Sequence, residues 1–339
     1  MTGTEAALSG LTKLDTSDDQ AIADLHAMHL AVQPVDWPWG PEPLLSELAG
    51  GLRHGWDGET DENWLLRDDD GAVIGSLSID LPKRENLHRV GLGVRVHPDH
   101  RRQGIGSRLY DAGLELARAS GRRVIGAWTH DHSPSYAAFA EKRGFRQVTV
   151  FVHRRQNFSE VDWDVVEALR QKALAAASDY RLLRFVGSVP EDLVDAVAVM
   201  ASAINDAPTD DMDVDDDVID AARVRSYENA RAARGETLYR LVAQRKSDGE
   251  LAGNTVIAVP RERPEWSEQH DTSVVAGHRG HRLGLLLKTE MLKWLAEVEP
   301  EVRHVDTGNA ESNNFMISIN EQLGYRIASR GIVWEKEIS

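Results

Sequence analysis

The sequence predicts an α/β (α+β) protein of two similar domains in tandem, each a mixed, mostly antiparallel sheet flanked by helices. Two observations indicate this fold class. The same order of apolar strands, glycine-bearing turns and amphipathic helices occurs twice along the chain. The markers of the repeat also keep their spacing: Arg101 and Arg279 are 178 residues apart, and Gly144 and Gly324 are 180 apart. An internal repeat of this length predicts two domains of one fold.

The repeat predicts a first domain over residues 1–156 and a second over residues 180–339. Residues 157–179 between them are expected to form a linker helix. Ser159 is a suitable N-cap for it. Its apolar residues fall on one helical stripe, namely Val161, Val165, Leu169 and Ala173.

The elements of the first domain follow from apolar periodicity and turn residues. A short strand precedes a helix with several apolar residues, and a Pro/Trp-rich loop then interrupts regular structure from Pro34 to Pro41. Asp70-Gly71 joins two apolar runs and predicts a hairpin. The later elements are expected at 90–96 (strand), 105–116 (helix), 123–128 (strand), 135–142 (helix) and 147–152 (strand).

The second domain repeats this order. Pro190 opens a helix after a first strand, and Ser247-Asp248-Gly249 joins the strands of a second hairpin. The expected elements are strands at 181–186, 237–243, 251–259 and 272–275, and an amphipathic helix from Leu283 to Leu295.

The turn between the strand 90–96 and the helix that follows is predicted to bind an anion. Amides in the first turn of a helix have no intrahelical partner, and the helix dipole adds a positive field there. Gly104 and Gly106 lack the Cβ that would keep a pyrophosphate from the backbone. The chain has no GxxxxGK[ST] motif, and no GxGxxG is followed by an acidic residue after the next strand, which excludes the usual nucleotide loops.

The spacing Arg101-x-x-Gly104-x-Gly106, after Val96-x-Pro98, resembles the acyl-CoA loop of the GNAT superfamily of N-acetyltransferases. The resemblance implies sheets that splay at a central strand and hold acetyl-CoA in the opening. In the first domain it implies CoA contacts from Val94, Val96, Arg101, Arg102, Gln103, Gly104, Ile105, Gly106 and Ser107. In the second domain, whose loop has an arginine in place of the first glycine, it implies contacts from Thr272, Val274, Arg279, Gly280, His281, Arg282, Leu283, Gly284 and Asn313.

Both domains depart from the family pattern before the Gly-aromatic pair. The family often has an Asn there and, seven residues later, a Tyr that protonates the departing CoA thiolate. The first domain has Ser133 and Ala140 at these positions, and Tyr136 is either a substitute acid or a packing residue. The second domain keeps Asn313 but has Asn320 in place of the Tyr. The standard acid is therefore missing from both.

In tandem members of this family such as mycothiol synthase, which this layout resembles, the second domain does the chemistry. An amine acceptor must lose a proton before it attacks, so a base beside the central strand is expected. Glu268, His270 and Asp271 are the catalytic candidates. Glu85 and His88 have a similar place in the first domain. The alternative for each is a solvated residue at a strand end.

Composition limits the partners. The 39 Lys and Arg against 55 Asp and Glu give a formal charge of −16, which argues against nucleic acid or an anionic membrane and favours a neutral or cationic small substrate. No apolar run approaches a membrane span and the first residues do not resemble a signal peptide, so we expect a cytoplasmic protein. We expect it to be a monomer or a homodimer. The chain has no cysteine, which excludes an acyl-cysteine intermediate and favours direct attack.

Two further patterns have alternative interpretations. Aspartates crowd residues 210–217, either as an acidic rim for a cationic acceptor or as a solvated, helix-capping loop. His130-Asp131-His132 and His97-x-Asp99-His100 lack a third convergent ligand, so no metal site is predicted.

The sequence thus predicts an acetyl-CoA-dependent N-acetyltransferase whose acceptor is a primary amine of a small molecule. The alternative is a non-catalytic acyl-CoA-binding sensor or scaffold.

Overall fold

The computed structural model describes residues 6–338. Contacts divide the chain into two compact units. Unit 1 comprises residues 1–150, 211–215 and 329–339, and unit 2 comprises residues 151–210 and 216–328. Among residues 6–338, no helix is both long and apolar enough to cross a membrane.

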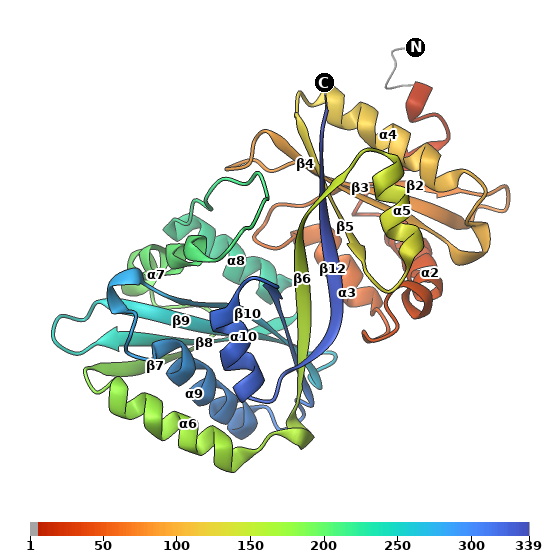
Figure 1. Ribbon diagram of the computed structural model, residues 1–339. Coiled ribbons are helices and arrows are strands. Elements are labelled where there is room, and N and C mark those ends of the chain that lie inside the picture. Colours follow the sequence, from red (N-terminus) through yellow and green to blue (C-terminus); the bar gives the residue numbers. More distant parts are fainter. Residues whose placement is uncertain (1–5, 339) are drawn as a thin grey trace. The chain divides into compact units, whose positions relative to one another are not determined.

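Unit 1 is a sheet with the strand order β1-β2-β3-β4-β5-β12, flanked by helices (Figure 1). Its pairs are antiparallel except for β4 with β5. The elements are β1 (Leu11–Lys13), α2 (Asp19–Asp36), α3 (Leu45–His54), β2 (Glu62–Arg67), β3 (Val73–Asp80), β4 (Arg89–Val96), α4 (Ile105–Ala119), β5 (Val124–His130), α5 (Pro134–Lys142), the start of β6 (Arg146–Asn157) and the end of β12 (Arg326–Glu337).

Unit 2 has the strand order β6-β11-β10-β9-β8-β7, and only β10 and β11 are parallel. Besides the rest of β6 and the start of β12, its elements are α6 (Trp163–Ala176), β7 (Tyr180–Val186), α7 (Val194–Ala201), α8 (Ala221–Ala233), β8 (Glu236–Arg245), β9 (Leu251–Pro260), β10 (Trp266–Val274), α9 (Leu283–Val298), β11 (His304–Ala310) and α10 (Asn314–Gln322). A short 3-10 turn precedes the helix in each CoA-type loop, Pro98–His100 and Ala276–His278.

The last strands of the two repeats are exchanged. β12 comes from the second repeat, but it pairs with β5 of the first, from Gly331↔His130 to Glu337↔Val124. β6 comes from the first repeat and pairs with β11 of the second, from His304↔Asn157 to Ala310↔Phe151. Each sheet is therefore completed by a strand from the other repeat.

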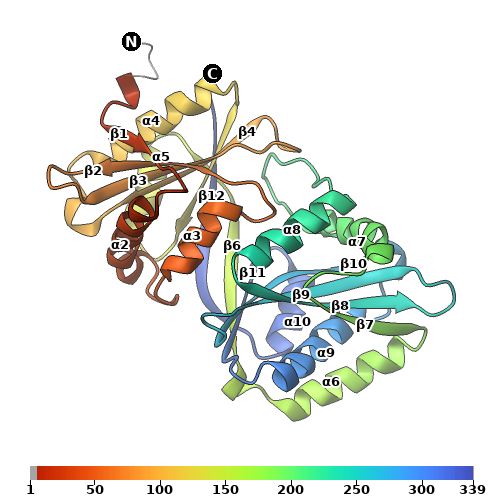
Figure 2. The same cartoon turned by 180° about the vertical axis from the view of Figure 1, so that it is seen from behind.

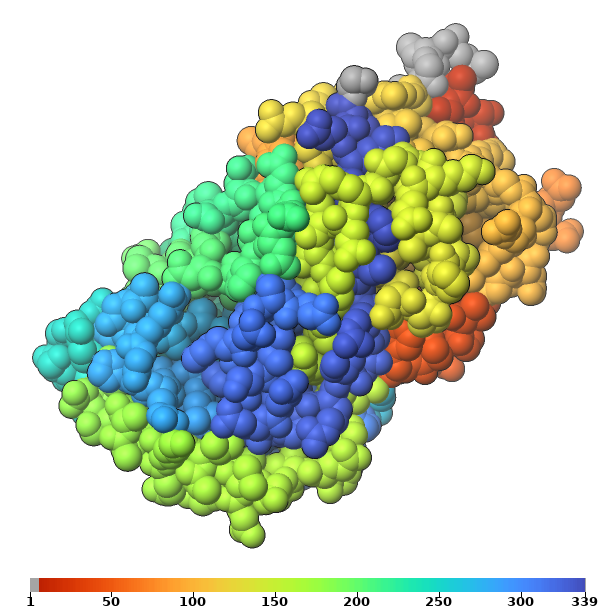
Figure 3. Space-filling model, in the orientation of Figure 1, coloured from red at the N-terminus to blue at the C-terminus, as the bar shows by residue number. Residues whose placement is uncertain are grey.

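Helices cover both faces of the sheet in unit 2. α9 is almost entirely buried and packs with α6 and α10 against one face, around Leu287, Met291 and Leu295. α7 and α8 cover the other face, which Figure 2 shows from behind. In the space-filling view the dark blue residues of α10 lie at the molecular surface (Figure 3), where Phe315 is 67% exposed.

The structure differs from the sequence-based elements between α2 and β2. α2 includes Pro34 and ends at Asp36, because a proline near the end of a helix removes only one backbone hydrogen bond. The helix α3 follows the Pro/Trp-rich loop and was not predicted. It has two adjacent glycines, Gly50 and Gly51, which weaken any helical pattern in the sequence.

Candidate functional site

The turn between β4 and α4 in unit 1 has the backbone of an anion-binding helix start. Gly104, the N-cap of α4, has φ +87°, and Arg102 has φ +63°. The guanidinium of Arg101 is engaged within the protein. Its Nε donates to the carbonyl oxygen of Val96 at 3.1 Å, and its Nη2 donates to the carboxylate of Asp36 at 2.8 Å. Arg101 thus joins the turn to the end of β4 and to α2.

The turn between β10 and α9 in unit 2 repeats this arrangement. Arg279 donates from Nε to the carbonyl oxygen of Val274 at 3.2 Å and pairs through Nη2 with Asp206. Gly280 has φ +88°. Arg282, in place of Gly104, is held at φ +56°, a conformation that costs about 1–2 kcal/mol for a residue with a Cβ.

The other predicted CoA contacts lie in these two turns, in the strands that enter them or in the helices that follow, except for Asn313, which lies at the start of α10. Ser107 accepts a hydrogen bond at its Oγ from Arg143 at 2.7 Å, and the Arg143 guanidinium lies 3.5 Å from the centre of the Phe139 ring. Asn313 caps α10 by accepting from the backbone amide of Met316 at 3.2 Å. The remaining residues are Val94, Gln103, Ile105 and Gly106 in unit 1, and Thr272, His281, Leu283 and Gly284 in unit 2.

Both sheets splay at the parallel pair, as the sequence predicted. β4 and β5 pair over three residues, and the pairing ends at Gly91↔Gly126. β10 and β11 also pair over three residues, and the pairing ends at Glu268↔Asp306. Beyond these positions the parallel strands are not hydrogen-bonded to each other. The last paired positions are two glycines in unit 1 and two carboxylates in unit 2.

A second difference between the units is a bulge in β10. The register of β10 against β9 shifts between Gln269 and Thr272, so His270 and Asp271 occupy a β-bulge. A bulge leaves backbone groups unpaired and redirects side chains, which is why bulges are frequent beside active sites. In unit 1, β4 pairs with β3 without any shift in register.

The bulge brings Glu268 and His270 together with Tyr227 of α8. The Tyr227 hydroxyl lies 2.5 Å from Nδ1 of His270, and Nε2 of His270 lies 3.7 Å from the Glu268 carboxylate. A protonated Tyr227 donates to Nδ1, which leaves the ring proton on Nε2, toward Glu268. The side chain of His270 is only 2% exposed, whereas that of Glu268 is 64% exposed.

Electrostatics keep Glu268 ionised and Tyr227 protonated. Desolvation raises the pKa of Glu268, but the interaction with His270 and the positive charge of Arg231 outweigh it, so the pKa lies below its ordinary value. Burial raises the pKa of the Tyr227 hydroxyl. Glu268 is thus an ionised carboxylate that is accessible to solvent.

Asp306, opposite Glu268, is already bound by protein groups. Arg155 forms a bidentate pair with it, with both N–O distances 2.7 Å, and the indole of Trp266 donates to it at 3.2 Å. Desolvation lowers the pKa of the neighbouring His153, against the charges of Glu268 and Asp306, which raise it. Asp306 is thus a fixed charge, and Glu268 is the carboxylate available to a substrate.

Sequence reasoning found part of this cluster. It placed Glu268, His270 and Asp271 beside the central strand, and the structure brings the first two together and leaves Asp271 exposed in the bulge. It missed Tyr227 and Arg155, which reach the cluster from α8 and β6. Nothing in the local sequence of either element indicates this.

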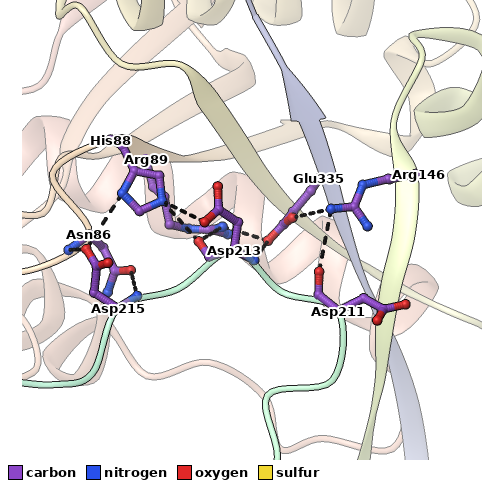
Figure 4. A network of polar contacts seen from close by, with 8 residues as sticks. All are labelled: Asn86, His88, Arg89, Arg146, Asp211, Asp213, Asp215 and Glu335. Atoms are coloured by element: carbon purple, nitrogen blue, oxygen red, sulfur yellow. Dashed lines mark hydrogen bonds and ion pairs between the residues drawn. The ribbon is translucent and has the colours of Figure 1, made fainter.

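His88 and the acidic segment lie elsewhere, in the network shown in Figure 4. The carboxylate of Glu335 is 2% exposed and accepts hydrogen bonds from Arg89 at 2.6 Å and Arg146 at 3.1 Å. The backbone amide of Asp213 also donates to Glu335, at 3.1 Å. His88 Nε2 lies 3.3 Å from the Asp213 carboxylate.

Residues 211–215 are thereby attached to unit 1. The backbone amide of Asp215 donates to the side-chain oxygen of Asn86 at 2.7 Å, and the backbone amide of Asn86 donates to the Asp215 carboxylate at 3.0 Å (Figure 4). Asp220, later in the loop, caps α8 through the Arg223 amide at 2.7 Å. These contacts give the three aspartates structural roles. Asp213 and Asp215 attach the loop to unit 1, and Asp220 caps α8.

The remaining candidates in unit 1 form an aromatic cluster. The Tyr136 hydroxyl donates to Asp36, and burial together with this bond raises its pKa to about 12. The rings of His130 and His132 pack edge-on against Trp39, with centroids 4.9 and 5.0 Å away. No group of three His, Asp or Glu side chains among residues 6–338 is arranged to hold a metal ion.

Comparison with known proteins agrees with these features. Residues 23–145 match the Acetyltransferase (GNAT) family. A mycothiol acetyltransferase of Stackebrandtia nassauensis is 28% identical over 126 residues, which are 37% of this chain and 40% of that protein. A mycothiol acetyltransferase of Parafrankia sp. (strain EAN1pec) is 29% identical over 202 residues, 60% of this chain and 57% of that protein. The chain thus matches about half the length of these curated relatives.

The fold of the whole chain also has a solved counterpart. A tandem GNAT protein from the clavulanic acid biosynthesis pathway superposes with a TM-score of 0.81 and 26% identity, over 96% of this chain and 98% of that one. The match extends over both repeats, each with its splayed sheet and its glycine-bearing turn. Residues 23–145 therefore match the GNAT acetyltransferase family, and the whole chain has the fold of a tandem GNAT protein.

Proposed function

We propose that this protein transfers an acetyl group from acetyl-CoA to a primary amine of a small molecule, and that unit 2 carries out the transfer. The observation that carries the proposal is the Glu268–His270 pair at the bulge of β10. It lies where β10 leaves β11, on the strand that leads into the turn at residues 279–284. A base and an anion-binding helix start are thus attached to one strand.

The residues have separate roles in this reaction. The amides of residues 280–284 bind the pyrophosphate of acetyl-CoA at the start of α9. An amine arrives as an ammonium ion, and the ionised Glu268 accepts its proton, directly or through a water. His270 orients the Glu268 carboxylate, and Tyr227 holds the His270 ring in the required tautomer. The neutral amine then attacks the thioester carbonyl carbon, the C–S bond breaks with its electron pair going to sulfur, and the nitrogen loses its second proton to water.

Unit 1 supports binding of acyl-CoA without turnover. Gly104 is the N-cap of α4 in unit 1. Ser107, which accepts a hydrogen bond from Arg143, lies in the first turn of that helix. The last paired residues of the parallel strands in unit 1 are Gly91 and Gly126, and β4 has no bulge. These features favour the sensor or scaffold alternative for unit 1 alone.

The chemistry of the acceptor follows from charge and from the relatives. Glu268 and Asp271 both carry exposed carboxylates on β10, which attract a cationic amine. The relatives named above are acetyltransferases whose name includes the small molecule mycothiol. Both points support a small amine as acceptor.

A thiol-release assay tests the proposal. The protein is incubated with acetyl-CoA and a panel of amino sugars, polyamines, amino acids and aromatic amines, and products are identified by mass spectrometry. The proposal predicts CoA release that depends on one class of amine, together with its N-acetyl product. Tightly bound CoA without turnover of any amine would favour the sensor alternative.

A further inference from the structure

Arg154 is a buried arginine that forms no ion pair with any of residues 6–338. It lies on the part of β6 that belongs to unit 2, opposite Thr307 of β11, and is 4% exposed. Its Nε and Nη1 are buried and have no hydrogen-bond partner among residues 6–338. A buried guanidinium without an anion costs several kcal/mol. The site is therefore electrostatically incomplete in the absence of a ligand.

The residues of β11 that share a face of the sheet with Arg154 are polar but neutral. Thr307 follows Asp306, the last residue of β11 that pairs with β10, so it begins the stretch of β11 beyond the splay. Asn309 lies on the same face of β11, diagonally across from Arg154, where Cβ atoms are about 7 Å apart. The Asn309 side-chain oxygen accepts from Asn320 of α10 at 3.0 Å. The side-chain oxygen of Asn320 is itself buried and has no hydrogen-bond partner in the described part of the chain.

The equivalent position in unit 1 is electrostatically complete. Trp334 is 180 residues after Arg154 and pairs with Ala127, which is 180 residues before Thr307. The indole of Trp334 donates to the Thr129 hydroxyl at 2.8 Å and is 3% exposed. Two strands in the same relation thus present a satisfied neutral ring in unit 1 and an unpaired cation in unit 2. This contrast separates Arg154 from the common requirements of the fold.

We propose that Arg154 stabilises the CoA thiolate that is released when unit 2 transfers the acetyl group; the inference rests on the proposed function. The amine nitrogen forms a bond to the thioester carbonyl carbon, the C–S bond breaks, and its electron pair goes to sulfur. The ammonium gives its first proton to Glu268 before the attack, and the nitrogen loses its second proton to water as the C–S bond breaks. Neither Thr307, Asn309 nor Asn320 carries an acidic proton, and a guanidinium does not release one at neutral pH. The thiolate therefore leaves unprotonated, paired with Arg154, and takes a proton from water after release.

Two substitutions test this role. Arg154→Met removes the charge and keeps the length of the side chain, and Arg154→Lys keeps a charge. We expect Arg154→Met to lower kcat about a hundredfold, as loss of one preorganised donor does in other acyl transfers, with the KM for acetyl-CoA unchanged. Arg154→Lys is expected to retain most of kcat. Because Met replaces an unpaired buried charge, the variant should melt at or above the temperature of the wild type.

A spectroscopic titration measures the interaction directly. The ultraviolet absorbance of the thiolate of bound CoA is followed against pH in wild type and Arg154→Met. If Arg154 stabilises the thiolate, the thiol of bound CoA should titrate at least one pH unit lower in the wild type than in Arg154→Met. S-ethyl-CoA, which cannot form a thiolate, should bind both proteins equally.

Lys288→Met is the matched control, since Lys288 is also a buried basic residue of unit 2, and its Nζ has no hydrogen-bond partner among residues 6–338. It should leave kcat and the thiol titration unchanged. Equal kcat and equal titration in wild type and Arg154→Met would overturn the inference while leaving the proposed function standing. If the wild type acetylates no amine, the proposed function fails, and the titration still decides whether Arg154 binds a thiolate.

Discussion

The carboxylate of Glu268 lies 3.7 Å from Nε2 of His270, at the last position where β10 pairs with β11. In unit 1 that position is Gly91, on a strand without a bulge. The two units therefore share a sheet that splays at its parallel pair, and the last paired residues of that pair are carboxylates in unit 2 and glycines in unit 1. Binding of acyl-CoA and stabilisation of a transition state are separate properties, so two repeats of one fold need not share both.

Tyr227→Phe tests the positioning role of the tyrosine. The substitution removes the donor to Nδ1 of His270, so the ring no longer has one preferred tautomer. Loss of one such hydrogen bond, about 1 kcal/mol, predicts a fivefold to tenfold lower kcat with an unchanged KM for acetyl-CoA. Steady-state kinetics across pH measure this.

Tyr110→Phe is the matched control for Tyr227→Phe. Tyr110 is a buried tyrosine of unit 1 whose hydroxyl accepts from Lys336 at 2.9 Å, far along the chain from the β10 cluster. It should lose a comparable amount of stability and keep the wild-type kcat. Equal kcat values for the two variants would remove Tyr227 from the account.

Gly104→Val tests acyl-CoA binding by unit 1. A β-branched residue is strained at φ +87°, and its side chain would occupy the approach to the amides of α4, although its Cβ meets no atom within 4 Å. Affinity at this site should fall roughly tenfold or more, about 1.4 kcal/mol. Calorimetry with acetyl-CoA on the full chain should resolve a weakened first site while turnover persists. An unchanged binding isotherm would show that residues 101–107 do not hold CoA.

Lys288→Met should stabilise the protein in a pH-dependent manner. Burial lowers the pKa of Lys288 to about 7, from an ordinary value of 10.5. Between pH 7 and pH 10.5, Lys288 is therefore protonated in the unfolded chain but mostly neutral in the folded protein. The free energy of unfolding consequently rises as the pH increases from 7 toward 10.5. The penalty amounts to on the order of 3–5 kcal/mol at and below pH 7 and disappears near pH 10.5.

Urea unfolding at several pH values measures this penalty. The gain in unfolding free energy from Lys288→Met should be largest at pH 7 and below, and should shrink steadily toward pH 10. A gain that does not change with pH would mean that Lys288 is charged in the folded protein throughout.

Glu335→Gln should release residues 211–215. The buried carboxylate accepts from Arg89, Arg146 and the amide of Asp213, and a neutral amide leaves the arginines without their counter-charge (Figure 4). Breaking such a pair costs about 3–5 kcal/mol. Hydrogen exchange should show faster exchange of the amides of Asp213 and Asp215. Exchange rates equal to the wild type would show that these bonds do not hold the segment.

Much of the fold could be predicted because it is written in local patterns. The Asp70-Gly71 hairpin, the turn at Gly104 and the apolar stripe of α4 all depend on residues near one another in the sequence. The exchange of β6 and β12 between the sheets does not, since an apolar strand pattern is compatible with pairing in either sheet. Only the register of β12 with β5 shows where it lies.

The candidate site could likewise be predicted only in part from the sequence. Glu268 and His270 could be found because they precede the CoA-type turn on one strand. The contacts that give them their roles are non-local: Tyr227 is 43 residues from His270, and Arg155 is 151 residues from Asp306. Arg154 has no sequence signal at all, because its unusual property is the absence of a partner inside the folded unit.

The assignment of turnover to Glu268 is the central claim, and kcat/KM of Glu268→Gln tests it most directly. Glu297→Gln, an exposed carboxylate of α9 in the same unit, is the matched control. With the amine that the wild type acetylates, Glu268→Gln should lose between 10²- and 10⁴-fold in kcat/KM and keep its affinity for CoA, whereas Glu297→Gln should match the wild type. Near-normal turnover by Glu268→Gln, together with loss of activity in Gly104→Val, would contradict the account and place the reaction in unit 1.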